Sequence, residues 1–300
     1  MINDKFRRQL PLYLMLVPGM IVVIIYSYIP MIGVVIAFQR FIPAKGLFGP
    51  QEWVGLGNFR YMLTLPDTFR ILRNTIFISS MKIIAGLIIP IIIALLINEI
   101  RKEWFKRTVQ TIIYLPHFLS WVIFAGILID ILSPSEGIVN RILESIGISQ
   151  IYFLGSPKWF PYTMVLTDLW KSFGFSTIVY LAALTNISPT LYEAAEIDGA
   201  NRWQQTWHIT LPGMRPIIVL LATLSLGNVL NAGFEQIFNL YSPQVYETGD
   251  IIDTFVYRIG LIQAQYGLAT AVGLLKSVVS FGLIGLSYYL AYRFADYRIF

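Results

Sequence analysis

The chain has 300 residues, of which 56% are hydrophobic and 13% are charged, and its mean hydropathy is +0.65. Soluble domains carry about 25% charged residues, so this composition excludes an ordinary soluble protein and indicates an integral membrane protein. Cysteine is absent, which excludes a disulfide framework and a thiolate metal site. The two histidines, His117 and His208, are too few and too far apart for a metal cluster, and no metal site is expected.

The N-terminal stretch carries Lys5, Arg7 and Arg8 ahead of an apolar run over residues 12–38. This pattern resembles the start of a signal peptide, but the run is too long for one and no small-residue cleavage site follows it. About 20 residues cross the hydrocarbon core of a bilayer, so the run predicts an uncleaved first spanning helix.

Six apolar segments in all are predicted as spanning helices: residues 12–38, 73–97, 109–132, 162–185, 217–233 and 268–293. Between them, the sequence has room for a short helix over residues 139–146 and an amphipathic surface helix over residues 252–263. The sequence therefore predicts an all-α polytopic membrane protein with a single transmembrane domain over residues 1–300.

Basic residues are concentrated in the segments that lie on one side of this predicted topology. The N-terminus, residues 100–107, residues 188–216 and the C-terminus with Arg298 are rich in arginine and lysine, whereas the opposite loops are longer and hold fewer. By the positive-inside rule, both termini and residues 188–216 are expected to be cytosolic. The net charge of +5 then reflects this bias and does not indicate a nucleic-acid partner.

Residues 188–216 form a polar segment of about thirty residues in an otherwise lipid-compatible chain. Ser188 is expected to cap a helix there, and Thr190 with Glu193 has the spacing of a capping box. Gly199 follows at a position where a left-handed residue can end the helix. The segment therefore predicts a short, tight pair of helices suited to docking in a groove of another protein.

Three blocks of this segment carry a family resemblance: Glu193-Ala194-Ala195, Asp198-Gly199-Ala200 and Ile209-Thr210-Leu211-Pro212. In order and spacing they resemble the E-A-A, D-G-A and I-x-L-P loop of type I binding-protein-dependent ABC importer permeases. In that family the loop forms coupling helices that sit in a cleft of the ATP-hydrolysing subunit. The resemblance implies an ATPase-coupling role for seven residues: Glu193, Ala194, Ala195, Asp198, Gly199, Leu211 and Pro212. The alternative is an ordinary cytosolic loop between two membrane helices.

The resemblance extends over nearly the whole chain. Residues 54–59 and 114–118 resemble segments of carbohydrate permeases. Residues 233–243 and 251–261, together with 27–38, resemble a branch of these permeases that handles oligosaccharides or polysaccharide fragments. It implies a second, related permease subunit, two ATPase subunits that bind ATP and Mg²⁺, an extracytoplasmic binding protein and a saccharide cargo. It also implies a location in the bacterial cytoplasmic membrane, surrounded by lipid.

Enzymatic motifs are not found. The sequence contains no phosphate-cradling loop, no nucleophile elbow and no H-E-x-x-H motif, so no catalytic residue or cofactor is expected in this chain. ATP hydrolysis would take place in a separate subunit. The alternatives are an ABC permease for a non-sugar solute, a secondary transporter, or an intramembrane enzyme, which would need convergent catalytic groups.

Polar residues inside spans are candidates for the cargo pathway. Ser225, Asn228 and Asn231 recur every three residues, with Glu235 just beyond, and are expected to share one wet helical face. Hydrogen bonding between packed helices explains such residues equally well. Lys276 is expected to pair with Glu235 or to meet a carboxylate on the cargo.

Two further charges lie one helical turn apart within the predicted fourth span. Asp168 and Lys171 are expected to neutralise each other. Lys82 in the second span is expected to have a structural role.

Overall fold

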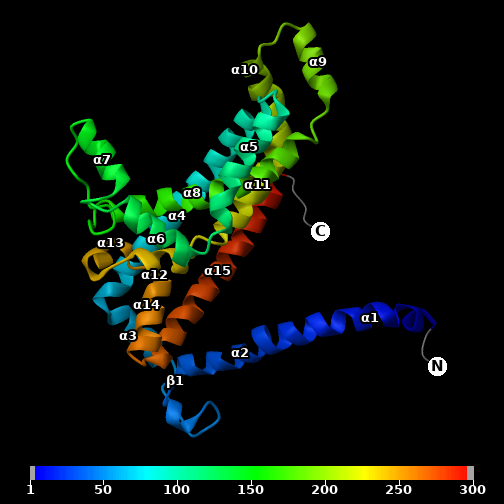
Figure 1. Cartoon of the computed structure of the whole chain (residues 1–300). Coiled ribbons are helices and arrows are strands. Elements are labelled where there is room, and N and C mark those ends of the chain that lie inside the picture. Colours follow the sequence, from blue (N-terminus) through cyan, green and yellow to red (C-terminus); the bar gives the residue numbers. More distant parts are fainter. Residues whose placement is uncertain (1–3, 296–300) are drawn as a thin grey trace. The chain divides into compact units, whose positions relative to one another are not determined.

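The computed structural model describes residues 4–295, and there the elements are helices apart from one short two-stranded ribbon (Figure 1). The chain divides into two compact units. The first joins Met1–Pro66 to Val256–Leu275, and the second joins Asp67–Phe255 to Lys276–Phe300. The expectation of an all-α membrane protein is confirmed, while Arg298 lies outside the described residues.

The first unit begins with a long apolar helical run, Gln9–Phe38. It is assembled from α1 (Asp4–Val23), a π-helical turn η1 (Ile24–Tyr28), α2 (Ile29–Met31) and a 3₁₀ stretch η2 (Ile32–Phe38). The irregular turns surround Pro30, whose ring removes a backbone donor and clashes with the preceding turn. The predicted first span is therefore helical throughout but is not a regular α-helix.

The remaining elements of the first unit follow this run. Strands β1 (Gln39–Arg40) and β2 (Glu52–Trp53) pair antiparallel, with Gln39 opposite Trp53 and Arg40 opposite Glu52. An ion pair of 2.9 Å joins the Arg40 guanidinium to the Glu52 carboxylate. The other elements are η3 (Pro43–Lys45), α3 (Gly57–Thr64), η7 (Arg258–Ile262) and the first part of α15 (Tyr266–Ala295).

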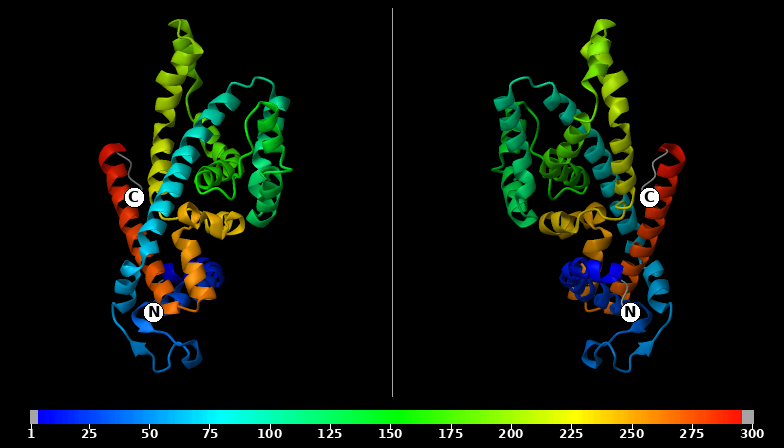
Figure 2. Two further views of the ribbon diagram at one scale, coloured as in Figure 1. Left: turned by 90° about the vertical axis from the view of Figure 1, so that its left-hand side faces the viewer. Right: turned by 90° about the vertical axis from the view of Figure 1, so that its right-hand side faces the viewer.

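The second unit holds most of the helices, and Figure 2 shows their arrangement from two sides. In chain order its elements are α4 (Pro66–Asn98), α5 (Glu103–Tyr114), η4 (Leu115–Phe118), α6 (Trp121–Ile131), α7 (Ile138–Ser145), α8 (Phe160–Leu184), α9 (Pro189–Ile197), α10 (Arg202–Gln205), η5 (Thr206–Thr210), α11 (Leu211–Leu226), α12 (Phe234–Leu240), η6 (Pro243–Val245), α13 (Tyr246–Gly249) and α14 (Ile252–Tyr257). The short helix α7 and the run from α14 into η7 fall where the sequence predicted a short helix and a surface helix.

Four helices in the described residues are long and apolar enough to cross a membrane: Gln9–Phe38, Pro66–Asn98, Arg202–Leu226 and Tyr266–Leu290. A fifth span is possible if α5–η4 and α6, which are bent by 105° at a short break, count as one. Helix α8 covers the predicted fourth span with 25 residues but is not among the apolar helices. The count of six spans stays a prediction.

The predicted third span, residues 109–132, is broken rather than straight, because Pro116 interrupts it. Ser120 caps the second half, since its hydroxyl accepts a hydrogen bond of 3.3 Å from the backbone N–H of Ile123. The Lys171 ammonium of α8 donates to the carbonyl of His117 at 2.8 Å. The Ser120 cap and the Lys171 ammonium therefore stabilise the break between η4 and α6.

The predicted fifth span, residues 217–233, begins and ends earlier than expected. Helix runs continuously over Arg202–Leu226 and then stops. Gly227, Asn228, Asn231 and Gly233 follow, all residues of low helix propensity, and Gly233 has a left-handed φ of 92°. A non-helical segment, residues 227–233, therefore separates α11 from α12.

One face of α4 supplies hydrogen bonds to the chain that follows α11. The Ser79 hydroxyl donates to the carbonyl of Val229, and the Lys82 ammonium donates to the carbonyl of Ala232 at 2.7 Å. Backbone groups without helical partners inside a membrane must be satisfied by neighbouring side chains. Ser79 and Lys82 therefore stabilise the non-helical segment 227–233, because they donate to carbonyls that lack a helical partner.

The same face of α4 also contacts the chain further on. The Asn74 amide donates to the carbonyls of Glu247 and Asp250, at 2.9 and 3.3 Å. The Thr75 hydroxyl accepts from the backbone N–H of Ile252 at 2.9 Å. A buried apolar cluster around Ile78, Phe124, Phe160, Met164 and Ile237 packs beneath these bonds.

Replacing Asn74 by leucine should lower the stability of the second unit. The substitution keeps the side-chain volume but leaves two carbonyls without their donor, at a cost of about 2 kcal/mol. The measurement is the thermal midpoint of the detergent-solubilised protein, with Asn98→Leu, at an exposed position of the same helix, as the matched control. Equal midpoints for the two variants would show that the α4 face does not support the chain beyond α11.

Candidate functional site

Helix α9 ends in a Schellman motif, which fixes the direction of the chain after it. The backbone N–H of Ala200 bonds to the carbonyl of Ala195 at 2.8 Å, and that of Gly199 bonds to Glu196 at 3.1 Å. Gly199 has a φ of 77°, the left-handed conformation that L-residues with a β-carbon disfavour. The prediction that Gly199 ends this helix is confirmed.

The start of α9 differs from the prediction. Ser188 occupies the N-cap position, but its hydroxyl bonds to the Thr190 hydroxyl at 2.8 Å and makes no cap to the backbone. The expected capping box of Thr190 and Glu193 is not formed. It occurs instead at α10, where the Asn201 side chain accepts from the backbone of Gln204 and the Gln204 side chain accepts from that of Asn201.

Leu211 and Pro212, which the resemblance assigns to the coupling loop, lie at the start of helix α11. A π-helical turn, η5, precedes Pro212. Such a turn shifts the backbone hydrogen bonds by one residue, which accommodates the missing N–H of proline. Helices α10 and α11 are therefore one continuous element, and α9 lies at its end (Figure 1).

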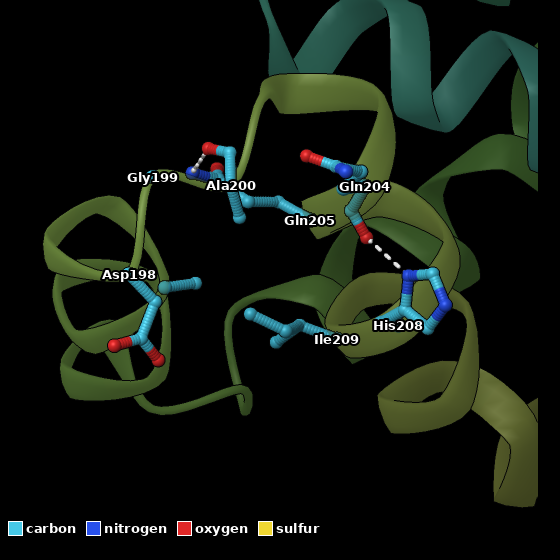
Figure 3. Close-up of a pocket in the computed structure, with 8 residues that line it drawn as sticks. Asp198, Gly199, Ala200, Gln204, Gln205, His208 and Ile209 are labelled. Atoms are coloured by element: carbon cyan, nitrogen blue, oxygen red, sulfur yellow. Dashed lines mark hydrogen bonds between the residues drawn. The ribbon is translucent and has the colours of Figure 1, made fainter.

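Side-chain bonds fasten α9 and its loop to this element. The Tyr192 hydroxyl bonds to that of Thr210 at 3.0 Å, and the Gln205 amide donates to the carbonyl of Ala200 at 3.2 Å. A cavity of about 340 Å³ lies there. Figure 3 shows the residues that line it, with Asp198 on one side and His208 on the other. Of the predicted coupling residues, Ala195, Asp198 and Gly199 line it.

The other predicted coupling residues lie outside this cavity. Glu193 and Ala194 are exposed on α9, Leu211 is half-buried and Pro212 is exposed at the start of α11. On another side of α9 and α10 is a groove of about 630 Å³ that the end of α4 also lines. An ion pair between Arg202 and Glu99 lies at this groove and links α10 to the end of α4.

A second site lies at the break after α11. A cavity of about 230 Å³ is lined there by Ser225, Asn228 and Asn231, together with Lys82 and Asp168. The structure thus brings together three of the five predicted pathway residues, although Asn228 and Asn231 lie beyond the helix end and not on a helical face. Glu235 and Lys276 are not among the lining residues.

Lys82 is the most buried charge of this cavity. Its side chain is 9% exposed, and its ammonium donates to the carbonyl of Ala232 and to the side-chain oxygen of Gln236. Gln236 is itself fully buried, and its amide donates to α8, to Met164 and Thr167 at 2.8 and 2.7 Å. These bonds fix the position of the ammonium relative to α8 and α12.

The expected ion pair between Asp168 and Lys171 is wrong, because each residue has a different partner. The Asp168 carboxylate lies 3.5 Å from the Lys82 ammonium, while Lys171 donates to the carbonyl of His117 and lies 5.4 Å from the centre of the Trp121 ring. The indole face attracts a cation, and the carbonyl replaces the expected carboxylate. Lys82 and Lys171 thus each donate to a carbonyl at a helix break.

The expected pairing of Lys276 with Glu235 is also wrong. Lys276 of α15 forms its ion pair with Asp253 of α14. The sequence did not indicate Asp253 as a partner, because it lies in a short amphipathic segment where an exposed carboxylate is common. Lys82 carried a usable signal, a charge inside an apolar span, but its partners come from segments about 90 to 150 residues away.

No metal-binding arrangement is found within residues 4–295, because no three histidine, aspartate or glutamate side chains there are close enough to share an ion.

The fold and these two sites, one on a helical pair at the end of α11 and one at a break inside the membrane region, define a membrane transport permease. Residues 86–299 match the family described as binding-protein-dependent transport system inner membrane component. The chain belongs to this family, whose members are transport permeases and not enzymes.

Relatives and solved structures extend this similarity to the full length of the chain. The chain is 42% identical to the polygalacturonan/rhamnogalacturonan transport system permease protein YteP of Bacillus subtilis (strain 168), over 99% of this chain and 92% of that protein. It is 41% identical, with a TM-score of 0.89, to a chain in the crystal structure of a bacterial ABC transporter involved in the import of the acidic polysaccharide alginate, covering 97% of this chain and 98% of that one. A crystal structure of a bacterial alginate ABC transporter in complex with an alginate pentasaccharide-bound periplasmic protein contains a chain of TM-score 0.90 and 40% identity, covering 99% of each.

Replacing Asn201 by alanine should loosen α10, because the capping box is lost at a cost of about 1 kcal/mol. The measurement is hydrogen exchange at the Gln204 amide, which should become faster. Ser188→Ala is the matched control, since Ser188 occupies an N-cap position without capping the backbone, and it should leave exchange at the start of α9 unchanged. Faster exchange in Ser188→Ala alone would contradict the assignment of the cap to Asn201.

Proposed function

We propose that this chain is a permease subunit of an ABC importer for acidic oligosaccharides or polysaccharide fragments. The observation that carries the proposal is the similarity, over nearly the whole chain, to a galacturonan permease and to an alginate importer. Galacturonate and alginate units both bear carboxylates. The cargo is therefore a chain of uronic acid units, which this subunit guides across the membrane without covalent chemistry.

The importer would contain a second permease, two ATPase subunits and an extracytoplasmic binding protein. The alginate transporter in complex with a saccharide-bound periplasmic protein supports the binding protein in this composition. The ATPase subunits would bind ATP and Mg²⁺, because this chain has no phosphate-cradling motif of its own. Six spans with both termini in the cytosol remain the proposed topology, on the strength of the basic residues at one side.

The pair α9 and α10 is the proposed contact with the ATPase. Its surface carries large exposed apolar side chains, with Ile197 87% and Trp203 70% exposed. The pair is rigidly joined to α11 through the continuous helix and the bond from Tyr192 to Thr210. A displacement of α9 would therefore be transmitted along α11 to the break at residues 227–233.

That break would line the cargo path. Ser225, Asn228 and Asn231 offer hydroxyl and amide groups of the kind that hydrogen-bond to sugars, and Asn228 and Asn231 are exposed. Alternating access follows if motion of α11 opens this polar cavity to one side of the membrane and then to the other. Glu235 and Lys276 lie outside the cavity and have at most an indirect part in this path.

The experiment uses the assembled importer in proteoliposomes with its binding protein and an alginate or galacturonate oligosaccharide. The saccharide should stimulate ATP hydrolysis by the native complex. Gly199→Val should lose most of this stimulation, because a β-branched residue disfavours the φ of 77° and redirects α9. Gly199→Asn, which tolerates the left-handed conformation, should keep it.

A steric clash does not explain the expected effect of Gly199→Val, because a β-carbon there would meet no atom within 4 Å. The contrast between valine and asparagine therefore isolates backbone direction. Both variants should reach the membrane at native levels. Full stimulation in Gly199→Val would contradict the proposal that α9 transmits the motion. If no acidic saccharide stimulates the native complex, the proposed cargo is wrong.

A further inference from the structure

The Lys82 ammonium has three N–H donors but only two close hydrogen-bond acceptors. A lysine ammonium carries three protons. Two are directed at the carbonyl of Ala232 and the side-chain oxygen of Gln236. The third has only the Asp168 carboxylate, at 3.5 Å, whereas an ammonium and a carboxylate in full contact lie about 2.7 to 2.9 Å apart. This last interaction is therefore the loosest of the three.

Both partners of this loose interaction line the cavity. Lys82 and Asp168 both line the 230 Å³ space beside Ser225, Asn228 and Asn231, and the Asp168 side chain is 30% exposed. The space is smaller than the roughly 300 to 1,000 Å³ of typical ligand pockets, which suits one sugar unit at a time. A carboxylate on that unit would reach the cavity-facing side of the ammonium.

We infer that Lys82 recognises the carboxylate of each acidic sugar unit and that Asp168 is the internal counter-ion which the cargo carboxylate replaces. The inference deepens the proposed function and rests on it, because it names the residue that selects acidic cargo. A buried lysine inside a membrane needs a negative partner, and here that partner is exchangeable. A neutral sugar brings no such partner and leaves the pair with Asp168 intact.

Once displaced, the Asp168 carboxylate stays partly exposed at the cavity, and Lys171, one helical turn further along α8, interacts with it electrostatically without forming an ion pair. Gly233 keeps the approach to Lys82 open, since a β-carbon at this residue would lie 3.0 Å from the ammonium nitrogen. The two remaining bonds of Lys82 keep the ammonium in place while its third partner changes.

The test compares trigalacturonate with its methyl ester, which has the same sugar chain without the charges. For each variant of the assembled importer, kcat/KM of stimulated ATP hydrolysis is measured with both sugars. The ratio of acid to ester is then divided by the ratio of the native complex. Because the binding protein is the same throughout, its own preference cancels.

The double variant Lys82→Gln/Asp168→Asn removes both charges and keeps a donor for the carbonyl of Ala232. Its acid-to-ester preference should fall about ten-fold or more, as expected for loss of a hydrogen bond to a charged group. Asp168→Asn alone should act in the opposite direction, lowering KM for trigalacturonate because the competing carboxylate is gone. A purely structural role of the pair would raise KM in both variants, and this result would overturn the inference.

Lys276→Gln/Asp253→Asn is the matched control, because it removes another ion pair whose lysine does not line the cavity. It should keep the native acid-to-ester ratio. If this variant changes the ratio and the Lys82 variant does not, the carboxylate is recognised at Lys276 and the inference fails. If the native complex responds to neither sugar, the proposed cargo class fails instead.

Discussion

The polar face of α4 is the feature on which the rest of the second unit depends. Ser79 and Lys82 give hydrogen bonds to the carbonyls of Val229 and Ala232, in a stretch where helix is interrupted. In a membrane such a break is stable only if protein groups replace the missing helical bonds. The face of α4 therefore supports the polar cavity at this break. Lys82 has two roles there, because it donates to the broken segment and is also the candidate for cargo recognition.

The sequence predicted the outline of this arrangement well where the signal was local. Helix α9 ends as expected, since Gly199 acts through its own backbone preference. Long apolar runs also identified four of the helices. The partners of buried charges could not be predicted, because Asp168 meets Lys82 and Lys276 meets Asp253 only after distant segments have packed. The capping box was placed at the wrong helix for a different reason, namely that two adjacent segments offered the same cap chemistry.

The two candidate sites are connected by one element, the continuous helix Arg202–Leu226. At one end its π-helical turn and the bond between Tyr192 and Thr210 hold α9, and at the other end it stops at the polar break. With the proposed docking surface at one end and the cavity at the other, such a helix would convert a displacement of α9 into a change of access to the cavity. This physical link, more than either site alone, explains how a subunit with no ATP-binding motif would use ATP.

The central claim is that the cavity at the break lies on the path of the saccharide. The direct measurement is the labelling of a single cysteine at Asn231 in the assembled importer, which is straightforward because the chain has no native cysteine. A small polar thiol reagent should modify Asn231→Cys, and an acidic oligosaccharide with its binding protein should slow the modification. Leu224→Cys on α11, which does not line the cavity, should show no such protection. Modification of Asn231→Cys at the same rate with and without the saccharide would contradict the account.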